Sequence, residues 1–272
     1  MKTSVSLATF KGPADMPALY QAADRAGISH IKSLEYDGVD LFIKDPKSDE
    51  TKNTINLLKE FSLGISVILP ASLTMEQLYL GAKNEDVRKK AVEKMLEIIE
   101  FAKEQNTNVA LGLIRGSVEE EDTLANFEKR FVKSCEELLK VSKPLGVDLL
   151  LEPINRYEIN NINTVQDGLD FLERTKLPIY FMIDTYHMYL ENENIADMLV
   201  KGLPYTKHIH FLDSNRLSPS MGKLNMAFYY KLLEQNGYKG YLGLETLPSP
   251  SRQVCAIAGA SFFYRMRNNI LN

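Results

Sequence analysis

The sequence predicts a single (β/α)8 barrel, an α/β fold that takes up residues 1–272 as one domain. Two observations lead to this prediction. Short apolar runs of strand type alternate eight times with longer helical segments. The length of 272 residues and the hydrophobic content of 44% also suit one large core and require no second domain.

Eight segments have the length and composition of buried strands, and each is followed by a segment with helical periodicity. The predicted strands are 4–9, 39–43, 65–69, 109–114, 147–152, 179–184, 208–212 and 241–245. The predicted helices are 16–34, 50–61, 85–104, 123–143, 165–175, 195–202, 226–237 and 252–270. Gly146 and Gly237 stand where helices of this length would end in a left-handed residue.

Two regions allow more than one interpretation. In 27–45 the run IKSLEYDG is interpreted as the end of a helix, with the strand at VDLFI. The segment 73–84 is longer than a tight connection needs and carries Met75 and Leu78. It is either a helical turn packed on the barrel mouth or a lid whose apolar residues face a substrate or another subunit.

Composition narrows the class of partner. A net charge of −4 gives no basic field for a polyanion, so the sequence predicts a small-molecule substrate and no nucleic acid. Cys135 and Cys255 have no partners at metal-like spacing and are interpreted as buried packing residues. No apolar run has the roughly 18 residues of a membrane span, and we expect a cytoplasmic protein without a membrane partner.

Four metal-type ligands each end a strand-like run in the second half of the chain. They are Glu152, Asp184, His210 and Glu245, and successive members are 32, 26 and 35 residues apart. Such spacing corresponds to one strand, one helix and their loops, which would bring all four to the carboxyl ends of consecutive strands. That end of a barrel is where active sites form.

A single carboxylate at a strand end is more often solvated than a ligand, but a converging set is different. Three acidic groups gathered without a cation would repel one another and lose hydration, and a divalent ion would stabilise them. Three oxygen ligands and one nitrogen form a hard set, for which Mn is the best match and Co or Mg are alternatives.

The blocks EPINRYE, DTYHM, HIHFLDSNR and GLETLP resemble the xylose-isomerase-like TIM barrels, the sugar phosphate isomerase/epimerase superfamily. They are most similar to its ketose 3-epimerase branch, which includes the D-tagatose 3-epimerase type and keto-sugar-acid epimerases. The resemblance covers the second half through these motifs and the first half only through architecture. It implies a metal-dependent isomerase of carbohydrate metabolism with a sugar substrate, and leaves a homodimer or homotetramer open.

The resemblance also implies residue roles. Glu152, Asp184, His210 and Glu245 would bind one divalent metal ion, and Glu152 and Glu245 would face opposite sides of the carbon that is epimerised. Glu158, His187 and Arg216 would hold the carbonyl end and hydroxyls of the substrate. Because His187 lies three residues after Asp184, we expect it in the loop that leaves the strand, where it contacts a substrate oxygen or orients Asp184.

The chemistry agrees with these roles independently of the family. Removing a proton next to a ketone creates an enolate, and a Lewis acid can stabilise its charge. A carboxylate can take the proton, and a second acid on the other face can return one with inverted configuration.

Three further side chains have less defined roles. Arg115 could hold a substrate carboxylate or orient Glu152. His208 shares strand parity with His210 and is interpreted as a core histidine one layer deeper. Lys223 stands where related sequences carry an imidazole, which favours an acidic or phosphorylated sugar.

The leading hypothesis is an epimerase of a ketose or keto-sugar acid. An aldose–ketose or hydroxypyruvate-type isomerase could use the same metal site, and a non-enzymatic sugar-binding barrel is a third class. A DNA-repair endonuclease of the same superfamily would need a histidine-rich cluster of several metals, whereas the chain has four histidines.

Overall fold

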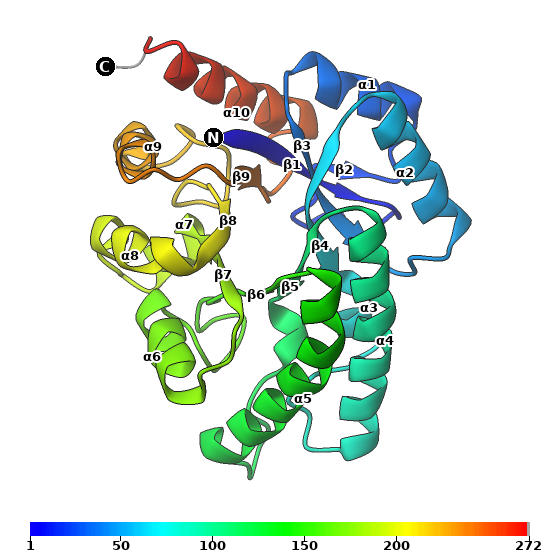
Figure 1. The fold of residues 1–272 in the computed structure, drawn as a ribbon. Coiled ribbons are helices and arrows are strands. Elements are labelled where there is room, and N and C mark those ends of the chain that lie inside the picture. The colour runs from blue at the N-terminus through cyan, green and yellow to red at the C-terminus, as the bar shows by residue number, and fades with distance from the viewer. Residues whose placement is uncertain (271–272) are drawn as a thin grey trace.

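The computed structural model describes residues 1–270 and confirms the barrel. Within this range eight parallel strands form a closed ring, because β1 pairs with both β3 and β9 (Figure 1). The ring consists of β1 (Lys2–Ala8), β3 (Gly38–Ile43), β4 (Gly64–Pro70), β5 (Asn108–Leu111), β6 (Leu149–Leu151), β7 (Tyr180–Asp184), β8 (Thr206–His210) and β9 (Tyr241–Leu244). A two-residue strand, β2 (Tyr20–Gln21), pairs with the carboxyl end of β1, at Leu7 and Ala8.

Helices surround the ring (Figure 1). They are α1 (Arg25–Ser33), α2 (Asp49–Glu60), α4 (Glu85–Glu104), α5 (Leu124–Leu145), α6 (Val165–Thr175), α8 (Ile195–Gly202), α9 (Met226–Gln235) and α10 (Arg252–Arg267). Two shorter helices, α3 (Ala71–Met75) and α7 (Thr185–Leu190), follow strands directly at their carboxyl ends. Short 3-10 turns cover Leu113–Arg115 and Leu203–Tyr205. Across residues 1–270, no helix combines the length and apolar character that a membrane crossing would require.

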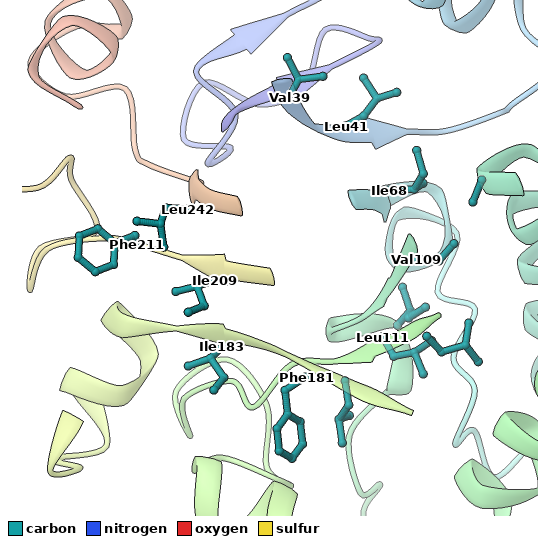
Figure 2. Close-up of a cluster of buried hydrophobic side chains, with 14 of the residues drawn as sticks. Val39, Leu41, Ile68, Val109, Leu111, Phe181, Ile183, Ile209, Phe211 and Leu242 are labelled. Atoms are coloured by element: carbon teal, nitrogen blue, oxygen red, sulfur yellow. The ribbon is translucent and has the colours of Figure 1, made fainter. Parts of the chain in front are cut away.

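The core has two layers because strand side chains alternate in direction. One set points outward to the helices, and Figure 2 shows members of it on successive strands, among them Leu41, Ile183 and Ile209. The opposite set forms a separate cluster that includes Leu150 and Met182 inside the ring. The hydrophobic layer outside the ring thus binds helices to strands, and the smaller inner layer supports the site above it.

The predicted helix 16–34 is too long, since the structure has a helix only over Arg25–Ser33. Pro17 lacks a backbone N–H for a helix, and the following residues Tyr20 and Gln21 pair with β1 instead. The predicted strand 109–114 is also too long: β5 ends at Leu111.

Helix ends agree with the sequence-based expectation. Gly146 follows α5 with φ 71°, and Gly237 follows α9 with φ 76°, both in the left-handed region that glycine adopts without strain. Thr164 caps α6 and accepts a hydrogen bond from the Asp167 amide at 3.0 Å, while Asp167 accepts one from the Thr164 amide at 2.9 Å.

A half-buried acid from the segment before α8, Glu193, lies against the amino end of α6. Glu193 accepts a hydrogen bond from the Val165 amide at 3.1 Å, and burial raises the pKa of this carboxyl to about 7. Because the folded protein holds the proton more tightly than the unfolded chain, ionisation of Glu193 opposes folding.

We therefore expect the free energy of unfolding to decrease as pH rises from about 4.5 to 7, the interval between the ordinary and the raised pKa of Glu193. Glu193→Gln cannot ionise and should flatten the pH dependence in this interval. Urea unfolding at several pH values measures it. If the free energy of unfolding depended on pH equally in the wild-type protein and in Glu193→Gln, the raised pKa of Glu193 would be contradicted.

Candidate active site

The four ligand candidates lie at the carboxyl ends of consecutive strands, as their spacing predicted. Asp184 and His210 are the last residues of β7 and β8, and Glu152 and Glu245 directly follow β6 and β9. All four side chains are buried. The parallel register, in which Asp184 pairs with His210, holds them at one depth of the barrel.

Their polar atoms converge on a common space. His210 Nδ1 lies 3.4 Å from Glu152 Oε1 and 3.9 Å from Asp184 Oδ2. Asp184, His210 and Glu245 each offer a ligand atom within 4.8 Å of the others. Glu152 Oε1, Asp184 Oδ2 and His210 Nδ1 have no hydrogen-bond partner in the part of the chain that the structure describes. Buried acceptors left unpaired around one point fit a cation.

The charges at this point require compensation. Burial lowers the pKa of His210, but Glu245, Glu152 and Asp40 outweigh it and raise this pKa to about 10. Burial raises the pKa of Asp184, and His187 and His210 only partly oppose the rise. The acidic groups of the site thus favour a positive charge among them, and a bound divalent cation would neutralise part of their negative charge.

His187 lies in α7, and its expected position in a loop is wrong. Asn155, which the sequence analysis missed, fixes its ring: Asn155 Nδ2 lies 2.7 Å from His187 Nδ1. The Tyr157 amide donates to Asn155 Oδ1 at 3.0 Å, which sets the orientation of the Asn155 amide. His187 Nδ1 then accepts, and Nε2–H, 3.8 Å from Asp184 Oδ2, can donate a hydrogen bond to a ligand in the pocket that His187 lines.

Arg216 joins two acidic side chains across the mouth. Its Nη2 donates to Glu245 at 2.8 Å, and its Nη1 donates to Glu158 at 3.1 Å. The guanidinium also lies over the Tyr186 ring, 5.5 Å from its centroid. A backbone φ of 58° at Arg216 is unusual for a residue with a side chain and places the guanidinium over the site.

Arg115 lies beneath the pocket and is fully buried. It donates to the Glu152 carbonyl at 2.7 Å, to the Gly112 carbonyl at 3.1 Å and to the Asn161 side chain at 2.9 Å. Since its nitrogens already have partners and the residue does not line the pocket, the geometry favours orientation of Glu152 over contact with a substrate carboxylate.

Glu152 and Glu245 line a cavity of about 370 Å³. The rest of its lining is largely apolar and includes Phe10, Phe42, Leu69 and Met75. Met75 ends α3, so the segment 73–84 begins with a helical turn at the mouth and also presents an apolar residue to the cavity. Lys223 is exposed and does not line this cavity, contrary to what its position suggested.

The barrel and its cluster of acids and imidazoles define a protein with a small-molecule site of the kind that could hold a metal ion. A family model described as "Xylose isomerase-like TIM barrel" matches residues 28–264. The chain belongs to this family.

Several relatives are named as sugar epimerases. The chain is 26% identical over 233 residues to an L-ribulose 3-epimerase of Methylomonas sp. (strain DH-1), covering 84% of this chain and 80% of the relative. It is 31% identical over 109 residues to 3-dehydro-D-guloside 4-epimerase of Escherichia coli K12, covering 40% and 42%. A solved structure of an L-ribulose 3-epimerase matches the fold with a TM-score of 0.81 at 19% identity, covering 99% and 95%.

We expect removal of divalent ions by a chelator to lower the melting temperature by about 5 °C or more, because an ion that binds only the folded state stabilises it by mass action. Addition of Mn²⁺ should restore it. Differential scanning calorimetry measures the change in melting temperature. In His210→Ala, chelation should leave the melting temperature unchanged. A melting temperature unaffected by chelation in a protein shown to contain metal would contradict the site.

Proposed function

We propose that this protein is a divalent-metal-dependent epimerase of a ketose or keto-sugar acid. The observation that carries the proposal is the converging set of unpaired buried acceptors on Glu152, Asp184 and His210, with Glu245 beside them. These four residues would hold one ion, with Mn as the first candidate and Co or Mg as alternatives. The relatives named as 3- and 4-epimerases support the reaction class.

The bound ion would supply a Lewis acid for the substrate carbonyl, which lowers the cost of forming an enolate. The protein residues do the rest. His187, held by Asn155, donates Nε2–H to a substrate oxygen, and Arg216 with Glu158 holds hydroxyls at the mouth. Arg115 keeps the backbone of Glu152 in place through its carbonyl.

Glu152 and Glu245 exchange the proton. They extend from β6 and β9, which are separated by β7 and β8 in the ring, so they approach the cavity from different sides. One carboxylate removes the proton from the carbon next to the carbonyl, and the carboxylic acid opposite returns a proton to the other face. The base ends protonated and the acid ends ionised, so the roles reverse in the next turnover.

The electrostatics of the pair support different protonation states. Burial raises the pKa of Glu245, although His210 and Arg216 oppose the rise. Burial acts in the same direction on Glu152, but the contact with His210 outweighs it and lowers this pKa. Two carboxyls whose environments move their pKa values apart suit one base and one acid.

Of the two substrate classes proposed, the lining of the cavity favours a neutral ketose over a keto-sugar acid. Among the described residues that line it, Arg216 is the lone guanidinium or ammonium group, and it is already paired with Glu158 and Glu245. A phosphate would bring about two negative charges to a site rich in carboxylates without a free basic partner. The apolar part of the lining instead suits the carbon chain of an uncharged substrate.

Turnover in heavy water should place solvent deuterium on the epimerised carbon. Glu152→Gln and Glu245→Gln should each lower kcat by at least about 100-fold, because either face loses its proton carrier. Mass spectrometry and NMR of the product locate the label. Glu234→Gln makes the same chemical change on the exposed face of α9 and should leave the rate unchanged.

Both glutamates are also proposed ligands, so metal content must be measured in each variant before the rates are compared. Full epimerisation by metal-loaded Glu245→Gln would exclude the two-base mechanism. Deuterium at the neighbouring carbon with an aldose product would instead identify an aldose–ketose isomerase.

Among ketoses, keto-sugar acids and their phosphate esters, we expect kcat/KM to be at least about 10-fold higher for a neutral ketose than for its phosphate, because the phosphate finds no free cation in the cavity. A coupled or chromatographic assay of product stereochemistry measures this ratio. A higher kcat/KM for the phosphate than for the neutral ketose would contradict the inferred preference for an uncharged substrate.

A further inference from the structure

Beneath the proposed metal site lies a buried carboxylate, Asp40, to which the proposed mechanism assigns no role. Asp40, in the middle of β3, has no exposed surface and faces the interior of the ring. His208 and His210 approach it from β8 with ring centroids 5.0 Å apart and nearly perpendicular planes. A fully buried carboxylate is costly unless it is paired, so its presence here requires an explanation.

The Asp40 carboxylate is held from below. Ser4 Oγ donates to Oδ1 at 2.6 Å, and Ser66 Oγ donates to the same oxygen. Oδ2 has no hydrogen-bond partner within the described residues and lies 3.5 Å from His210 Nε2. This separation is a few tenths of an ångström beyond an ordinary N–H···O hydrogen bond.

The two nitrogens of His210 therefore face different environments. Nδ1 points to Glu152 and Asp184, and Nε2 points to Asp40. An imidazole that binds a metal ion is neutral and carries one N–H, and a carboxylate beside Nε2 favours the proton there. That leaves the lone pair of Nδ1 directed toward the carboxylates of the proposed metal site.

The neighbouring strand leaves room for this arrangement. A Cβ at Gly243 in β9 would lie 2.1 Å from Asp40 Oδ2 and 2.8 Å from His208 Nε2. Any larger residue at 243 would collide with Asp40 and His208, so glycine is required here because the two side chains approach the β9 backbone closely. Strands β3, β8 and β9 all contribute to the space around the carboxylate.

We propose that Asp40 is a positioning residue that holds His210 with Nε2–H toward Oδ2 and so presents Nδ1 to the metal ion. The inference rests on the proposed metal site and assigns it a specific ligand atom. His208, 3.4 Å from Asp40 Oδ1, packs against both groups and limits rotation of the His210 ring.

An alternative hypothesis is that Asp40, His208 and His210 bind a second ion, since each offers a ligand atom within 4.8 Å of the others. Two facts favour the positioning role. Oδ1 already accepts two hydroxyl hydrogen bonds, and the Asp40–His210 separation is close to that of direct contact. Metal stoichiometry distinguishes the two.

The experiment compares Mn²⁺ binding by the wild-type protein and by Asp40→Asn, measured by competition with a chromophoric chelator. We expect about one ion per wild-type chain and a 10- to 100-fold weaker affinity in the variant, the usual effect of removing a carboxylate partner from a metal-bound histidine. Asp37→Asn is the matched control. Asp37 accepts from the Thr3 amide at 2.7 Å at the opposite end of the barrel, and its loss should leave metal affinity unchanged.

A spectroscopic reading separates positioning from general loss of stability. In the 15N-labelled protein loaded with diamagnetic Zn²⁺, the four histidines are few enough to assign by substitution. We expect His210 to bind through Nδ1 and to show a slowly exchanging Nε2–H, which Asp40→Asn should make fast. If Asp40→Asn does not fold, Ser66→Ala removes one hydroxyl from Oδ1 and should produce the same change to a smaller degree.

The outcomes are distinct. Absence of any ion in the wild-type protein would overturn the proposed function, and with it this inference. Equal affinity and an unchanged Nε2–H in Asp40→Asn would overturn the positioning role alone. Coordination through Nε2, or two ions per chain with one lost in Asp40→Asn, would also overturn it.

Discussion

The rest of the site depends on charge compensation at the mouth of the barrel. Glu152, Asp184 and Glu245 are all buried around His210, and their exclusion from water leaves their mutual repulsion poorly screened. His210 and Arg216 reduce this repulsion from below and from above. Closure of the ring through β1 and β9 fixes the positions of the strands, so the carboxylates cannot move apart to relieve the strain.

Much of the fold was predictable because each strand and helix of a barrel is specified locally. The helices Glu85–Glu104, Val165–Thr175 and Ile195–Gly202 have the predicted limits, since their apolar periodicity ends at clear boundaries. The error at 16–34 has a different cause. Residues 20–21 are drawn into the sheet by pairing with β1, a contact that local periodicity does not encode.

For the site, the strand-end positions of Glu152, Asp184, His210 and Glu245 could be inferred from spacing alone, because parallel strands place their carboxyl ends together. The neighbours of each side chain could not be inferred from the sequence. Asp40 offered a signal, an acid within the apolar run VDLFI, but its contact with β8 depends on closure of the ring. The partners of Arg115 are mainly backbone carbonyls, which no residue pattern reveals.

The pairing of Arg216 with Glu158 and Glu245 has a consequence for how tightly any ligand can be held. A sugar hydroxyl that reaches this guanidinium exchanges one hydrogen-bond partner for another, so the net gain on binding is small. If Glu245 carries the proton as proposed, the same exchange would release its carboxylate when a substrate arrives. The reactivity of Glu245 would then depend on occupancy of the pocket, which would limit proton exchange with solvent between turnovers.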